Sequence, residues 1–195
     1  GLGGDVQYLK TQAQTAYYRP LPLDLVGALK INLGYVDGWG GDKIRLSDRY
    51  YRGGSTFRGF EIAGVGPRQL FSSTRRSRAI GGKAYAVGSA ELLLPLPLPE
   101  EYGIRASLFT DFGTAGIVDE EDKRLNDDLA NWVDPDGDGI YVAPIQDDLS
   151  LRASAGISID WRSPFGPVRI DIAEPFLQED YDEVESFRFS AGGQF

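Results

Sequence analysis

The stretch of sequence that decides the fold is residues 25–35, which read LVGALKINLGY. Leu29 and Ile31 fall on one face of an extended chain, and Lys30 and Asn32 fall on the other, because strand side chains alternate with a period of two. One face is apolar throughout and the other is polar or small. This alternation predicts a β-strand that meets lipid on one side and a wet interior on the other.

The same alternation recurs in six further segments. They cover residues 6–18, 83–94, 104–112, 151–162, 168–173 and 186–195. In one of them, Ile157 and Ile159 alternate with Ser158 and Asp160. No apolar run approaches the ~18 residues of a membrane-spanning helix. The sequence therefore predicts an all-β, antiparallel fold of seven strands.

The connections between these strands alternate in length. Short turns are expected at residues 19–24, 95–103 and 163–167, and long loops at about 37–82, 115–150 and 174–185. A soluble β-sandwich would also alternate, with its polar face in bulk water. Short periplasmic turns opposite long extracellular loops, with strands close to the ~9–11 residues of a tilted spanning strand, favour an antiparallel transmembrane β-barrel.

Composition narrows the function. The net charge of −9 argues against nucleic acid as a partner, because phosphate binding needs a basic surface. The chain has no His and no Cys, so the usual catalytic base and thiol are missing and we expect no enzyme, although Asp–Asp and Ser–Lys pairs remain open. Since it also has no Met, we expect a mature, cut or engineered piece.

The first long loop holds an unusual arginine. Residues 53–60 read GGSTFRGF, and their glycines let the backbone fold back on itself. Arg58 lies between two aromatic residues, while Glu91 and Asp111 fall on the polar faces of their strands. An ordinary arginine in a solvated loop is the alternative interpretation.

Several motifs, in order along nearly the whole chain, resemble the BamA superfamily of outer-membrane proteins. Residues 57–60, FRGF, are similar to its inward loop, usually Val-Arg-Gly-Phe or Tyr, with Phe57 in place of Val. Further similar stretches are SAEL at 89–92, FTDFGT at 109–114, SPFGP at 163–167 and AEPF at 173–176.

The resemblance implies that the loop at about 37–82 folds into the barrel lumen and is locked there. The implied lock comprises Arg58, Gly59, Phe60, Glu91 and Asp111. A guanidinium binds carboxylates in a bidentate way, and breaking such a buried pair from one side costs about 3–5 kcal/mol. Loss of Arg58 should therefore loosen the loop without abolishing the strands.

The end of the chain is a second signature. Residues 187–195, FRFSAGGQF, alternate aromatic with polar residues and end in Phe, which resembles the C-terminal signal of outer-membrane barrels. The superfamily resemblance implies a lateral seam, where a kink weakens pairing of the last strand with the first. The implied seam residues are Phe187, Phe189, Gly192, Gly193 and Phe195. Simple flexibility of the two glycines is the alternative.

The second long loop contains DPDGDG at residues 134–139. Asp134, Asp136 and Asp138, followed by Gly139, match the start of a calcium-binding loop. Position twelve is Ile145 instead of the bidentate Glu, so Asp147 or Asp148 would have to substitute. A calcium loop and an acidic, turn-rich surface loop both stay open, and no other cofactor is expected.

The resemblance gives one overall expectation. Residues 1–195 would be about the last seven strands of a sixteen-stranded barrel in the bacterial outer membrane, an assembly factor that folds and inserts β-barrel proteins through its seam. The implied partners are outer-membrane lipids, unfolded barrel clients, periplasmic chaperones, accessory lipoproteins, and the remaining strands or another copy. A protein-secreting pore of the same superfamily is the alternative, and a passive porin would need no inward loop anchored by Arg58.

Overall fold

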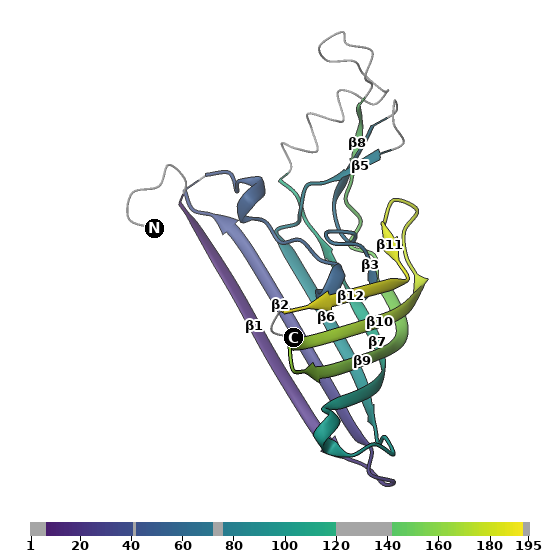
Figure 1. Ribbon diagram of the computed structural model, residues 1–195. Helices are drawn as coiled ribbons and strands as arrows, with labels where there is room; N and C mark the ends of the chain where they lie inside the picture. The colour runs from purple at the N-terminus through teal and green to yellow at the C-terminus, as the bar shows by residue number, and fades with distance from the viewer. Residues whose placement is uncertain (1–6, 41, 72–75, 120–141, 193–195) are drawn as a thin grey trace.

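The computed structural model describes residues 7–40, 42–71, 76–119 and 142–192. Seven strands form one curved antiparallel sheet in the order β1-β2-β6-β7-β9-β10-β12 (Figure 1). Their bounds are β1 Tyr8–Pro20, β2 Val26–Gly38, β6 Ala84–Leu94, β7 Ile104–Gly116, β9 Arg152–Ser163, β10 Gly166–Leu177 and β12 Phe187–Ala191. The predicted all-β antiparallel fold is confirmed.

Each strand pairs with the neighbour that follows it in this order, without a crossover. The first six strands are 11 to 13 residues long, enough for a tilted strand to span a bilayer. The last strand, β12, has five residues. Short connections (residues 21–25, 95–103 and 164–165) join the strands at one end, and long ones (39–83, 117–151 and 178–186) join them at the other.

The sheet is open. Its edges are β1 and β12, which do not pair with each other within the described residues. Every residue of β1 is exposed, on both faces of the strand. Among the described residues, no helix is long and apolar enough to cross a membrane.

The long connection between β2 and β6, residues 39–83, returns over one face of the sheet. We call it the inward loop, and the face that it covers the inner face. Its short elements are η1 Leu46–Asp48, η2 Gly54–Thr56, β3 Gly59–Phe60, β4 Arg68–Phe71 and β5 Arg76–Ala79. The other short elements are η3 Glu100–Tyr102, β8 Val142–Gln146 and β11 Val184–Glu185. The short strands among these elements form two small sheets, in the orders β11-β3 and β5-β4-β8.

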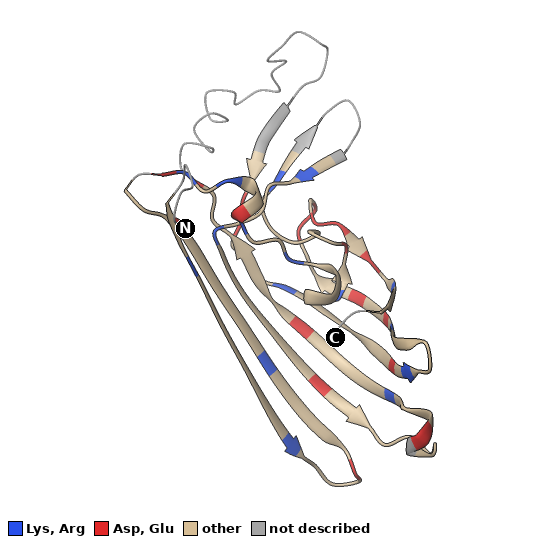
Figure 2. Cartoon of the chain, turned by 60° about the vertical axis from the view of Figure 1, so that its left-hand side comes forward, with Lys and Arg blue, Asp and Glu red and all other residues tan. Residues whose placement is uncertain are grey.

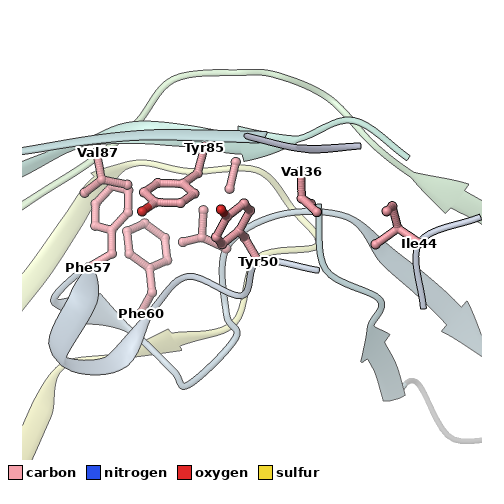
Figure 3. Packing of buried hydrophobic residues seen from close by; sticks show 9 residues of the cluster. Val36, Ile44, Tyr50, Phe57, Phe60, Tyr85 and Val87 are labelled. Carbon is pink, nitrogen blue, oxygen red and sulfur yellow. The ribbon is translucent and has the colours of Figure 1, made fainter. Parts of the chain in front are cut away.

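The main hydrophobic core lies between the inward loop and the inner face (Figure 3). Tyr50 of the loop meets Tyr85 of β6 edge-on, with 4.8 Å between ring centroids. Phe57 and Phe60 are fully buried and stack edge-on at 5.0 Å. These aromatic pairs fix the loop on the sheet and so position Arg58, which lies between the two phenylalanines in sequence.

Candidate functional site

The two faces of the sheet have the opposite polarity to those of a water-soluble sheet. Large apolar side chains are exposed on the outer face, among them Leu29, Ile31, Leu33, Ile157, Ile159, Ile172, Phe187 and Phe189. Polar and charged side chains are buried on the inner face, among them Ser107, Asp111, Ser154, Ser158 and Asp171. Such an arrangement is stable where lipid covers the outer face.

Arg58 lies at the centre of the inner face, with 4% of its side chain exposed. Its Nη2 is 2.6 Å and its Nε 2.8 Å from the two carboxylate oxygens of Asp111 on β7, which makes a bidentate pair. Its Nη1 is 2.8 Å from a carboxylate oxygen of Glu91 on β6. The structure therefore brings together Arg58, Glu91 and Asp111, as the resemblance implied; their function as a lock stays a prediction.

Serine hydroxyls complete the coordination of Arg58. Its guanidinium donates to Ser89 Oγ at 2.7 Å and to Ser158 Oγ at 3.1 Å. The Arg58 carbonyl accepts a hydrogen bond from Ser154 Oγ at 2.5 Å. The guanidinium also lies over the ring of Phe109, 3.5 Å from its centroid. Three strands, β6, β7 and β9, thus contribute to one buried cation site.

The strand register explains how these groups meet. Lys30 of β2 pairs with Ser89, Ser89 pairs with Asp111, and Asp111 pairs with Ser154, so one row of inner-face side chains crosses four strands. Lys30 Nζ is also 2.9 Å from Glu91, and Arg169 Nη2 is 3.9 Å from it, so Glu91 has three cationic partners with Arg58. Figure 2 shows that charged residues of both signs lie in the middle of the long strands.

Gly59 permits the close approach of the loop to the wall. Its φ is +87°, a conformation that L side chains rarely adopt. A Cβ at Gly59 would lie 2.9 Å from Ser154 Cβ on β9. Glycine is therefore required next to Arg58 for two independent reasons. Beside the lock, a polar cavity of about 500 Å³ remains, lined by Gln14, Lys30, Asn32, Arg52 and Arg169 among others.

The predicted seam residues lie at the edge of the sheet. Phe187 and Phe189 are on β12 with 58% and 59% of their surface exposed. Gly192 follows β12 with a φ of +76°, and its N–H donates to the Pro167 carbonyl at 2.9 Å. Gly193 and Phe195 lie outside the described residues, as do Asp134, Asp136 and Asp138 of the predicted calcium loop.

A second buried ion pair, not predicted from the sequence, holds the loop before β12. Arg152, at the start of β9, pairs with Asp182 at 3.0 Å, and both side chains are fully buried. Arg152 also donates to the carbonyls of Asp148 and Ser150 at 2.8 and 2.9 Å. The hydroxyl of Tyr181 accepts from Arg152 at 2.9 Å, and burial raises the pKa of Tyr181. The only sequence signal was the polar alternation that places Arg152 opposite Leu151 and Ala153.

A curved antiparallel sheet with an apolar outer face, a charged inner face and a loop packed inside it defines the wall of a transmembrane β-barrel. The family model described as the Omp85 superfamily domain matches residues 1–195, and the chain belongs to this family. The family assignment confirms the prediction that the chain is not an enzyme.

The relatives carry related names. The outer membrane protein assembly factor BamA of Neorickettsia risticii is 27% identical over 196 residues, which cover 100% of this chain and 23% of that protein. The BamA of Neisseria meningitidis serogroup B is 29% identical over 200 residues, 99% of this chain and 24% of its own length. The mouse sorting and assembly machinery component 50 homolog is 32% identical over 108 residues, 55% of this chain and 22% of its own length.

A solved structure agrees in fold. The crystal structure of BamA from Haemophilus ducreyi lacking POTRA domains 1–3 superposes with a TM-score of 0.75 at 29% identity, covering 96% of this chain and 35% of that one. This chain thus spans about a quarter of the length of the BamA relatives. The family places the chain in an outer membrane, of bacteria or of mitochondria.

Proposed function

We propose that residues 1–195 are the C-terminal barrel portion of an outer-membrane protein assembly factor, which folds and inserts other β-barrel proteins. The names of the BamA relatives support the general function. The observation that carries the mechanism is the edge formed by β12. This strand makes five register pairs with β10, whereas β10 makes eleven with β9.

An edge strand presents unpaired N–H and C=O groups, which can template a strand of another chain. The short ladder of β12 and the glycine that follows it make this edge easier to displace than the rest of the wall. A client strand would pair with this edge, and its apolar side chains would continue the outer face beside Phe187 and Phe189. No covalent chemistry is required.

The lock at Arg58 has a different function in this proposal. It ties the inward loop to β6, β7 and β9, which are paired on both edges. The wall behind the seam therefore stays rigid while the edge exchanges partners. The proposed location is the bacterial outer membrane, and the proposed partners are its lipids, unfolded barrel clients, periplasmic chaperones and accessory lipoproteins. The other strands of the wall would come from the same barrel or from another copy.

The test is a folding assay in liposomes. The chain is reconstituted into vesicles, and an unrelated urea-denatured outer-membrane barrel protein is added. The rate of client folding is measured by electrophoresis of unheated samples, in which the folded client migrates differently from the unfolded client. Faster folding than in protein-free vesicles is expected. Ion conductance through the vesicles without any acceleration of client folding would overturn the proposal and favour a secreting pore.

A further inference from the structure

The segments next to the lock and next to the seam pair with each other. β3, Gly59–Phe60, follows Arg58 directly, and β11, Val184–Glu185, is separated from β12 by Ser186 alone. Glu185 pairs with Gly59, and Val184 pairs with Phe60, in antiparallel register. The lock and the last strand are thus connected by backbone pairing as well as by the sheet.

The pairing continues beyond these two strands. The Glu61 N–H donates to the Glu183 carbonyl at 2.9 Å, and the Glu183 N–H donates to the Gly64 carbonyl at 3.1 Å. A Cβ at Gly64 would collide with the Glu183 carbonyl oxygen, so this contact has no room for a side chain. We call the paired residues 59–64 and 183–185 the clasp.

The Glu183 carboxylate anchors the clasp. It lies 2.6 Å from Arg68 Nη2, and Arg68 is 3% exposed while Glu183 is 38% exposed. Ser77 Oγ donates to the same carboxylate at 2.7 Å and accepts from Arg68 Nε at 2.8 Å. Arg68 also donates to the Ala63 carbonyl at 2.6 Å. Without Glu183, the buried Arg68 would keep its charge but lose its carboxylate partner.

The seam strand touches the same assembly. Arg188 of β12 forms an ion pair with Glu185 of β11. Its guanidinium Cζ lies 3.3 Å from the position that a Cβ would take at Gly54, so it packs against the turn that precedes the lock. The Ala173 N–H of β10 donates to the Ser186 carbonyl at 3.0 Å, which fixes the residue between β11 and β12.

We infer that Glu183 is a positioning residue that couples the inward loop to the edge strand through the clasp. This inference rests on the proposed function of the β12 edge. Movement of β12 when a client strand pairs with it strains the clasp and loosens the inward loop, and release of Arg58 loosens β12. Coupling of this kind is reciprocal, since it is a free energy shared by the two sites.

The test is hydrogen exchange measured by mass spectrometry on the chain in lipid nanodiscs. The decisive variant is Glu183→Gln, which keeps the size of the side chain and removes its charge. It should speed exchange about tenfold both in residues 54–60 and in residues 187–191. Asp48→Asn is the matched control, because this loop carboxylate accepts from the Tyr8 hydroxyl at 3.1 Å, on β1. This control variant should leave the rate of hydrogen exchange in residues 187–191 unchanged.

The reciprocal variant is Arg58→Ala. The ion pairs and side-chain hydrogen bonds of Arg58 go to β6, β7 and β9, and none of these strands pairs with β12. Coupling predicts faster exchange in residues 187–191, and a double variant with Glu183→Gln whose effect there is less than the product of the two. Exchange that increases in only one of the two segments would overturn the inference. A double variant whose effect equals the product of the two single effects would also overturn it.

Client folding is measured in parallel with the same variants. If exchange increases in both segments but the chain does not accelerate client folding, the coupling through the clasp is supported and the proposed function is contradicted. If clients fold faster while the two segments exchange independently, the proposed function is supported and the coupling is contradicted. Glu183→Gln is used in place of Glu183→Ala because it is nearly isosteric, and its far-ultraviolet spectrum should be that of the unaltered β-sheet.

Discussion

At the residue scale, Arg58 is a buried cation whose partners come from three strands. Replacing Arg58 by Ala leaves Asp111 without its bidentate partner, and Asp111 is 4% exposed. We expect a loss of about 3–5 kcal/mol in the local stability of the inward loop. Chymotrypsin, which cleaves after Phe, should cut the loop faster, while the circular dichroism of the sheet stays the same.

The control for this prediction is Arg105→Ala, which removes an exposed arginine from β7. Arg58→Lys should resemble Arg58→Ala more than the unaltered chain, because an ammonium group cannot form the two parallel hydrogen bonds to Asp111. Equal resistance of the Arg58→Ala variant and the unaltered chain to chymotrypsin would show that the lock does not hold the loop.

Gly59 gives a second residue-scale prediction. Gly59→Ala should speed chymotrypsin cleavage of the inward loop, because a Cβ would meet Ser154 and a φ of +87° is strained for alanine. The expected loss in the local stability of the inward loop is about 1–3 kcal/mol. Gly40→Ala is the control, since Gly40 also has a positive φ, +71°, but no atom lies within 4 Å of its Cβ position. Equal effects of the two variants would assign the cost to backbone strain alone.

Sequence reasoning reached part of this site. Alternation placed Glu91 and Asp111 on the polar face, and the resemblance supplied Arg58 as their partner. It did not identify Ser89 or Ser154, because a serine on a polar face gives no signal of what it binds. Which polar residues form a row is set by the register between strands, and a single strand's alternation does not contain that information.

At the scale of single elements, β2 presents opposite faces to lipid and lumen. Leu33 is 46% exposed on the outer face, and Asn32 lines the polar cavity of the inner face. Leu33→Lys should lower the free energy of unfolding in liposomes by about 2–4 kcal/mol, whereas Asn32→Lys should cost much less. Urea unfolding followed by tryptophan fluorescence measures both. A larger loss of unfolding free energy for Asn32→Lys than for Leu33→Lys would show that the lipid-facing and lumen-facing sides of β2 have been assigned the wrong way round.

The strands were predicted in number and order, but their ends were not. The segment expected at residues 168–173 is β10, which runs from Gly166 to Leu177 through Pro175. Pro175 is accommodated because the register with β9 shifts between Pro175 and Leu177, and a proline is tolerated where the ladder is irregular. Short elements such as β3 and β11 have two residues each and owe their extended form to contacts with each other, so no periodicity announces them.

The predicted calcium loop belongs to the same scale and stays a prediction, since residues 134–138 lie outside the described part of the chain. If Asp134, Asp136 and Asp138 bind calcium, about 1 mM Ca²⁺ should slow proteolysis of residues 117–151, and Mg²⁺ should not. Asp136→Asn should remove the protection. Cleavage at the same rate with Ca²⁺ and with a chelator would leave an acidic surface loop as the interpretation.

At the scale of the whole molecule, the chain is an open sheet with two different edges. β1 is thirteen residues long and exposed on both faces, whereas β12 is five residues long and connected to the inward loop through β11. The outer face suits lipid along the whole sheet, and the inner face is charged. This asymmetry between the edges is the feature on which the proposed templating of client strands depends.

The most direct measurement of that claim is disulfide cross-linking during client folding in liposomes. The chain contains no Cys, so Ser190→Cys on β12 introduces a single thiol, and Leu108→Cys on the central strand β7 serves as the control. Each is paired with a client that carries one Cys at successive positions of a terminal strand. The account predicts cross-links from Ser190→Cys at one register of the client strand and none from Leu108→Cys. Accelerated client folding with no cross-link to β12, or with equal cross-linking to both strands, would contradict it.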